Sequence, residues 1–86
     1  MKKVLLFVQH TCPHCQKAFR FMEELRAEHP AYRDIDVTVI DETEQPELAD
    51  TYDYYFVPTY FVDGQKLHEG FISKENVRTV LDAALS

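Results

Sequence analysis

The sequence predicts an α/β domain in which a four-stranded mixed sheet carries helices on both faces. Val4–Val8 is an unbroken apolar run, which is typical of a strand that is covered on both sides. Stretches with apolar residues at helical spacing follow Pro13 and Ser73, and they predict two longer helices. Asp63-Gly64 predicts a hairpin between two short strands, because both central residues of a type I′ turn need positive φ.

The first half of the chain predicts a strand, a helix and a second strand. The helix begins near Pro13, whose fixed φ suits the first helical position. It ends at His29-Pro30, because the residue before a proline avoids helical angles. A second strand is expected from about Ile35 to Ile40, where apolar and polar residues alternate as at a sheet edge. The apolar stripe of the helix consists of Ala18, Met22 and Leu25, widened by Phe19 and Phe21.

The second half predicts a short helix, a hairpin and a last helix. Pro46 opens the short helix, an aromatic loop follows, and the hairpin strands are expected at 59–62 and 65–69. Ser73 is a good N-cap for the last helix. The order is β-α-β-α-β-β-α, with parallel strands from the strand-helix-strand unit and antiparallel strands from the hairpin. The residues expected to point inward are Leu48, Ala49, Tyr52, Val77, Val80, Leu81, Ala84 and Leu85.

Length and composition indicate one small domain over residues 1–86. The hydrophobic content of 45% and the charged fraction of 28% are ordinary for a folded domain. The net charge of −6 argues against nucleic acid as a partner, because binding phosphates needs a basic surface. No stretch reaches membrane-spanning length, and the first apolar run is too short for an export signal. We therefore expect a cytoplasmic monomer that binds neither nucleic acid nor membrane.

Cys12 and Cys15 are the only cysteines, and they lie where the first strand passes into the first helix. The first turn of a helix has unpaired N–H groups and the positive end of the macrodipole, so it favours a thiolate at Cys12. Cys15 lies one turn further and can close a small disulfide ring with Cys12. In a reducing compartment such a pair is more often catalytic or metal-binding than structural. We interpret it as a dithiol/disulfide redox site that needs no cofactor.

Two other readings of the cysteine pair are open from the residues alone. In the first reading the pair binds a metal: it is half of a tetrahedral zinc site that His10 and His14 would complete, or it holds an iron–sulfur cluster shared between two copies. In the second reading the domain is a redox-inactive interaction module. The redox reading is favoured because no second cysteine pair exists, and we expect no metal.

Cys-Pro-x-Cys after the first strand, together with Val57-Pro58 before the hairpin, resembles the thioredoxin superfamily. The size and element order look like its smallest members, the glutaredoxins and glutaredoxin-like thioredoxins, over nearly the whole chain. The resemblance implies a thiol–disulfide oxidoreductase in which Cys12 attacks a disulfide and Cys15 resolves the mixed disulfide. It further implies that Pro58 is the family's cis-proline and that the backbone of Val57 pairs with an extended substrate.

The residues around these positions complete the predicted site. Pro13 and His14 match the dipeptide of periplasmic thiol oxidases of this superfamily, and His14 is expected to stabilise the Cys12 thiolate. A stabilised dithiol makes a more oxidising disulfide, so we expect a potential above the roughly −270 mV of thioredoxin. Further substrate contacts are expected from Thr11, Tyr55 and Phe56.

Several positions depart from the better-known subfamilies. Glutaredoxins usually have a lysine where this chain has Gln9, and Thr-Val-Pro where it has Phe56-Val57-Pro58. Thioredoxins usually bury an aspartate at the position of Leu6. These departures weaken the case for glutathione as the substrate and separate the chain from ordinary thioredoxins. The resemblance implies a disulfide-containing protein or glutathione as substrate, and a thioredoxin reductase-type enzyme or glutathione as electron donor.

Overall fold

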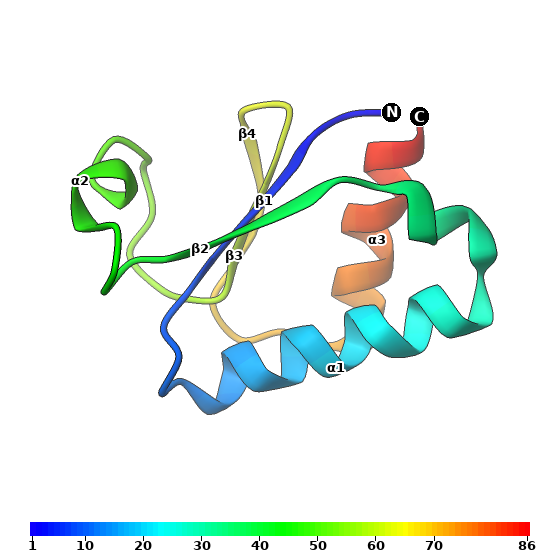
Figure 1. Cartoon of the computed structure of the whole chain (residues 1–86), viewed down its shortest axis with the longest axis horizontal. Helices are drawn as coiled ribbons and strands as arrows, with labels where there is room; N and C mark the ends of the chain where they lie inside the picture. Colours follow the sequence, from blue (N-terminus) through cyan, green and yellow to red (C-terminus); the bar gives the residue numbers. More distant parts are fainter.

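Four strands form one mixed sheet in the order β2-β1-β3-β4 (Figure 1). In this computed structural model, which describes residues 1–86, β1 pairs in parallel with β2 and antiparallel with β3, and β3 pairs antiparallel with β4. The predicted fold class and element order are confirmed. The strands are β1 (Val4–Val8), β2 (Val37–Asp41), β3 (Thr59–Val62) and β4 (Gln65–Glu69).

The two faces of the sheet are covered unequally. The long helices α1 (Pro13–Glu28) and α3 (Lys74–Leu85) lie on one face, and the short α2 (Pro46–Ala49) lies on the other (Figure 1). Sixteen buried residues form the core under α1 and α3, whereas four, Phe7, Ile40, Ala49 and Phe61, form a separate cluster on the α2 side. Successive residues of β1 alternate between these two cores, as the strand period requires.

The helix boundaries follow the predicted local signals. Pro13 occupies the first turn of α1, and the helix ends at Glu28, immediately before His29-Pro30. Ser73 caps α3: its hydroxyl accepts the Asn76 N–H, and the Asn76 side chain accepts the Ser73 N–H in return. The β3–β4 turn has positive φ at both Asp63 (51°) and Gly64 (81°), as predicted.

Three expectations about the second strand and the inward residues were wrong. Residues Pro30–Asp34 form a 3₁₀ turn, so β2 begins at Val37 and Ile35 is the buried residue that ends the turn. Leu48 is 39% exposed, because adjacent residues of a helix do not share a face and Ala49 is the one that points inward. Leu85 is also exposed, at the end of α3.

The remaining inward residues are placed as expected or lie at the margin of the core. Ala18, Met22 and Leu25 are buried, whereas Phe19 and Phe21 are half-buried against the same core. None of the helices combines the length and the apolar character that crossing a bilayer requires.

Candidate dithiol site

Cys12 is the residue that caps the start of α1. Its N–H donates to the Gln9 carbonyl at 3.0 Å, and its own carbonyl accepts the N–H groups of Cys15 and Gln16 at 3.1 and 3.2 Å. These bonds close the loop between β1 and α1 tightly on the first helical turn. The Cys12 side chain is half-buried, and its Sγ lies 3.9 Å from the carbonyl oxygen of Val57. One cysteine is thus held at a helix N-terminus and is only half-buried.

Cys15 is fully buried within the core under α1, and both thiols are free. Burial raises the pKa of the Cys15 thiol to about 12, and the neighbouring Cys12 and the more distant Glu42 carboxylate push in the same direction. A hydrogen bond from the Gln9 backbone opposes this rise without cancelling it. Cys15 therefore keeps its proton at neutral pH.

The loop that faces Cys12 is held by β4. The Val57–Pro58 peptide bond is cis, and the Pro58 carbonyl accepts the Gly70 N–H at 2.9 Å. The Glu69 carboxylate accepts the N–H groups of both Tyr55 and Phe56. An ion pair with Lys66 and these two N–H groups lower the pKa of Glu69 to about 2, so the carboxylate stays charged across the physiological range.

Val57 itself is left without backbone partners. Neither its N–H nor its carbonyl bonds to another backbone group, although the residues on both sides of the loop are anchored. An extended peptide can add to such a free backbone segment as a strand adds to a sheet edge.

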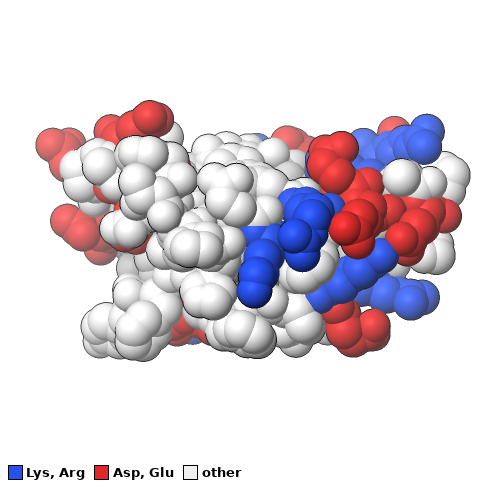
Figure 2. All heavy atoms as spheres, turned by 90° about the horizontal axis from the view of Figure 1, so that it is seen from below, with Lys and Arg blue, Asp and Glu red and all other residues white.

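Exposed aromatic side chains lie near the loop that contains Val57 and near the start of α1. Tyr55 is 84% exposed, Phe56 69% and Phe71 70%. The Phe71 ring meets His14 edge to face at 5.4 Å, and the Lys17 ammonium lies 5.9 Å from its centroid. We call Tyr55, Phe56 and Phe71 the aromatic rim. Figure 2 shows that the surface around the start of α1 is largely uncharged, whereas charges of both signs gather toward the other end of the helix.

The other predicted site residues lie at the same helix start. Thr11 and Pro13 are exposed beside Cys12, and His14 is half-buried with a buried Nδ1 that has no hydrogen-bond partner. No three His, Cys, Asp or Glu side chains converge on one point. The zinc ligand set that would add His10 and His14 to the cysteines is therefore not assembled within one chain.

Sequence reasoning missed two residues that shape this site. Glu69 and Phe71 reach the site from β4 and the turn after it, and only the hairpin fold brings them near Tyr55 and His14. The only indication in the sequence is that both residues are direct neighbours of Gly70. In the structure Gly70 has a φ of 85° and packs beside Phe56.

Comparison with known proteins agrees with this geometry. A family model described as a thioredoxin domain matches residues 2–82. A protein named thioredoxin from Methanocaldococcus jannaschii is 36% identical over 73 residues, covering 85% of this chain and 84% of that protein.

Solved structures share the fold at low sequence identity. The oxidised thioredoxin of Plasmodium falciparum is 15% identical, with a TM-score of 0.74 over 99% of this chain and 82% of that one. Desulfothioredoxin from Desulfovibrio vulgaris Hildenborough is 20% identical, with a TM-score of 0.68 over 95% of this chain and 80% of that one. The family match, the relative and the shared fold together show that the chain belongs to the thioredoxin superfamily.

Proposed function

We propose that the protein is a thiol–disulfide oxidoreductase that reduces disulfides in partner proteins. The observation that carries this proposal is the pairing of an accessible Cys12 at a helix N-terminus with a buried, protonated Cys15 one turn later. A helix N-terminus stabilises a thiolate, which is the reactive form, and the second sulfur is sheltered from any attacker except its neighbour.

The exchange takes two steps. The Cys12 thiolate attacks one sulfur of the partner disulfide, forms a mixed disulfide and releases the other sulfur as a thiolate. Cys15 then gives its proton to that first leaving thiolate and attacks the Cys12 sulfur, which forms the Cys12–Cys15 disulfide and releases the second partner sulfur as a thiolate. Two electrons pass from the dithiol to the substrate. A thioredoxin reductase-type enzyme or glutathione then returns the protein to its dithiol form, with no bound cofactor.

The surroundings of Cys12 favour a protein segment over a small-molecule disulfide as substrate. Val57 makes no backbone–backbone hydrogen bond, so an extended chain can pair with it, and the aromatic rim offers exposed apolar surface. Glutathione remains the second candidate, both as substrate and as donor. We further propose that the protein works in the cytoplasm as a monomer.

The test is reduction of insulin disulfides with two electron sources, thioredoxin reductase with NADPH in one reaction and glutathione with its reductase in the other. The wild type should be active in at least one. Cys12→Ser should lower the rate at least about a hundredfold, because an alcohol does not replace the thiolate. Cys15→Ser should accumulate a mixed disulfide with the substrate, visible by mass spectrometry.

Two results would contradict the proposal. A Cys12→Ser variant with full activity contradicts the proposed role of the site. A wild-type protein that forms no Cys12–Cys15 disulfide on oxidation contradicts the redox function and favours an interaction module.

A further inference from the structure

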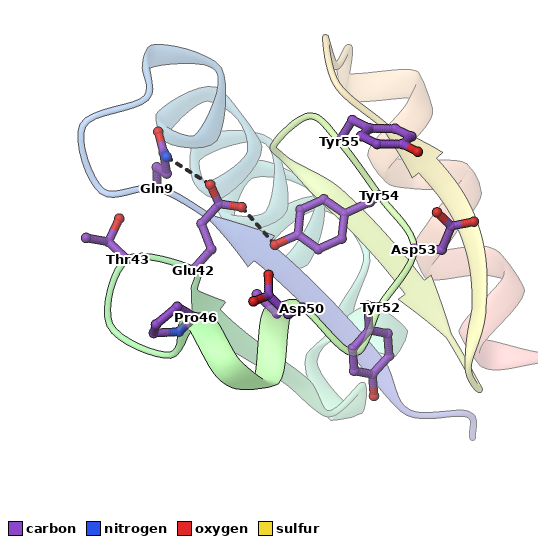
Figure 3. A pocket seen from close by; sticks show the side chains of 10 residues that line it. Gln9, Glu42, Thr43, Pro46, Asp50, Tyr52, Asp53, Tyr54 and Tyr55 are labelled. Atoms are coloured by element: carbon purple, nitrogen blue, oxygen red, sulfur yellow. Dashed lines mark hydrogen bonds between the residues drawn. The ribbon is translucent and has the colours of Figure 1, made fainter.

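A pocket of about 450 Å³ opens between α2 and the loop that leads to Val57 (Figure 3). The mechanism proposed above does not use it. Three tyrosines, Tyr52, Tyr54 and Tyr55, contribute to its wall, and no lysine or arginine does. The pocket is therefore concave, largely aromatic on one side and free of positive charge.

One carboxylate is fixed within the pocket wall. The Gln9 side-chain amide donates to Glu42 Oε2 at 2.8 Å, and the Tyr54 hydroxyl donates to Glu42 Oε1 at 2.8 Å (Figure 3). Burial and this bond raise the pKa of Tyr54, so its hydroxyl remains a donor at neutral pH. A carboxylate held in one orientation can bind a cation with little loss of side-chain freedom.

Two further carboxylates line the pocket: Asp50 lies on the same side as Glu42, and Asp53 lies on the far side of the Tyr54 ring (Figure 3). The nearby Lys66 does not line the pocket: its ammonium forms an ion pair with Glu69 at 2.8 Å and donates to the Asp53 backbone carbonyl. Carboxylates with aromatic faces are the groups that bind a guanidinium or ammonium, by charge pairing and by cation–π contact.

The pocket adjoins the dithiol site at two points. Gln9, which holds Glu42, also accepts the Cys12 N–H through its backbone carbonyl at 3.0 Å. Tyr55 belongs both to the pocket and to the aromatic rim, two residues before Val57. A partner segment that lies along Val57 with its disulfide at Cys12 therefore passes the mouth of the pocket.

We propose that this pocket receives an arginine or lysine side chain of the substrate protein, close in sequence to the cysteine that Cys12 attacks. This inference rests on the proposed function and specifies its substrate class: a disulfide flanked by a basic residue. The net charge of −6 adds long-range attraction for such a partner.

The experiment measures how fast short disulfide-bonded peptides oxidise the reduced protein. The peptides are identical except at one scanned position beside the cysteine, which carries arginine, glutamine or glutamate. With the wild type, arginine at the best position should react about fivefold faster than glutamine, and glutamate should react slowest. The arginine preference should shrink as salt is added, because the pocket is open to solvent.

Matched variants distinguish the effect of the pocket carboxylates on the arginine preference from the effect of net charge. Asp50→Asn/Asp53→Asn and, separately, Glu42→Gln should bring the arginine-to-glutamine ratio close to one. Glu23→Gln/Asp34→Asn removes two exposed charges outside the pocket and should keep the ratio. The aspartate pair is exposed, so that variant tests the pocket even where Glu42→Gln disturbs folding.

The possible results distinguish a failure of this inference from a failure of the proposed function on which it rests. Equal rates for arginine and glutamine peptides at every position overturn the pocket inference and leave the oxidoreductase intact. A preference that survives in the Asp50/Asp53 variant, or that Glu23→Gln/Asp34→Asn also removes, overturns it as well. Failure of every peptide to oxidise the wild type would instead count against the proposed function itself.

Discussion

The sulfur of Cys12 lies half-exposed before the first turn of α1, whereas Cys15, one turn later, is completely buried. Cys12 lies beside the Val57 carbonyl, 3.9 Å from its sulfur, and near exposed aromatic rings. Around Cys15 the neighbours are core side chains that exclude water. One short stretch of helix thus gives two chemically identical side chains different accessibility, and burial raises the pKa of the Cys15 thiol. The difference indicates which sulfur begins the exchange and which one completes it.

Alkylation should show the largest difference between the two sulfurs. At neutral pH, iodoacetamide should modify Cys12 at least about a hundredfold faster than Cys15, because Cys15 is buried and protonated and only the thiolate reacts. Peptide mapping by mass spectrometry after timed quenching measures both rates. Cys12→Ser provides the control, since its single thiol should stay unmodified on the same timescale. Similar rates at the two sites would contradict the comparison.

His14 should account for part of the difference in redox behaviour. It lies between the two cysteines, and its buried Nδ1 has no partner in the reduced protein, so it is available to stabilise a thiolate. We expect His14→Ala to lower the reduction potential by about 30 mV, which is about tenfold in the equilibrium with a thiol buffer. The wild-type potential should lie above roughly −270 mV.

Equilibration with glutathione buffers measures this shift, and His10→Ala is the matched control. His10 is exposed and pairs with Asp41 at 3.1 Å, outside the turn that joins the cysteines. Its replacement should leave the potential nearly unchanged. Equal shifts in both variants would mean that the general charge near the helix, not the residue between the cysteines, sets the potential.

The part of the site that local chemistry dictates could be predicted from sequence. An apolar strand, a proline at the first helical position and two cysteines one turn apart place the dithiol without any tertiary information. Two of the three strand pairings also followed, the parallel one from the crossover unit and the antiparallel one from the hairpin turn. The antiparallel β1–β3 pairing that joins the two units was not predicted. The nearness of Val57 to Cys12 came only from the family resemblance.

The rest depends on contacts that no local pattern encodes. Glu69 accepts the N–H of Tyr55, which lies 14 residues earlier in the chain. The position of Glu69 depends on the β3–β4 register, which contains an irregularity between Tyr60 and Phe61. The pocket carboxylate Glu42 likewise meets Gln9 from 33 residues away. In a run of acidic residues, nothing in the sequence marks the one that is held by two hydrogen bonds.

The proton on Cys15 should also make the stability of the reduced protein depend on pH. Burial raises the pKa of Cys15 from an ordinary value of 9.0 to about 12, so between these values the unfolded chain has released the proton and the folded protein still holds it. The folded state then binds more protons than the unfolded state, and its stability must fall as pH rises. Between about pH 8.5 and 10, the loss due to Cys15 should be about 1 kcal/mol. Tyrosines begin to ionise toward the top of this range, and the Cys15→Ala reference protein has the same tyrosines. Urea unfolding under reducing conditions measures the loss, with Cys15→Ala as the reference that lacks the buried thiol. If the two proteins lose stability in parallel across this range, Cys15 does not hold its proton in the folded state, and the two sulfurs differ only in accessibility.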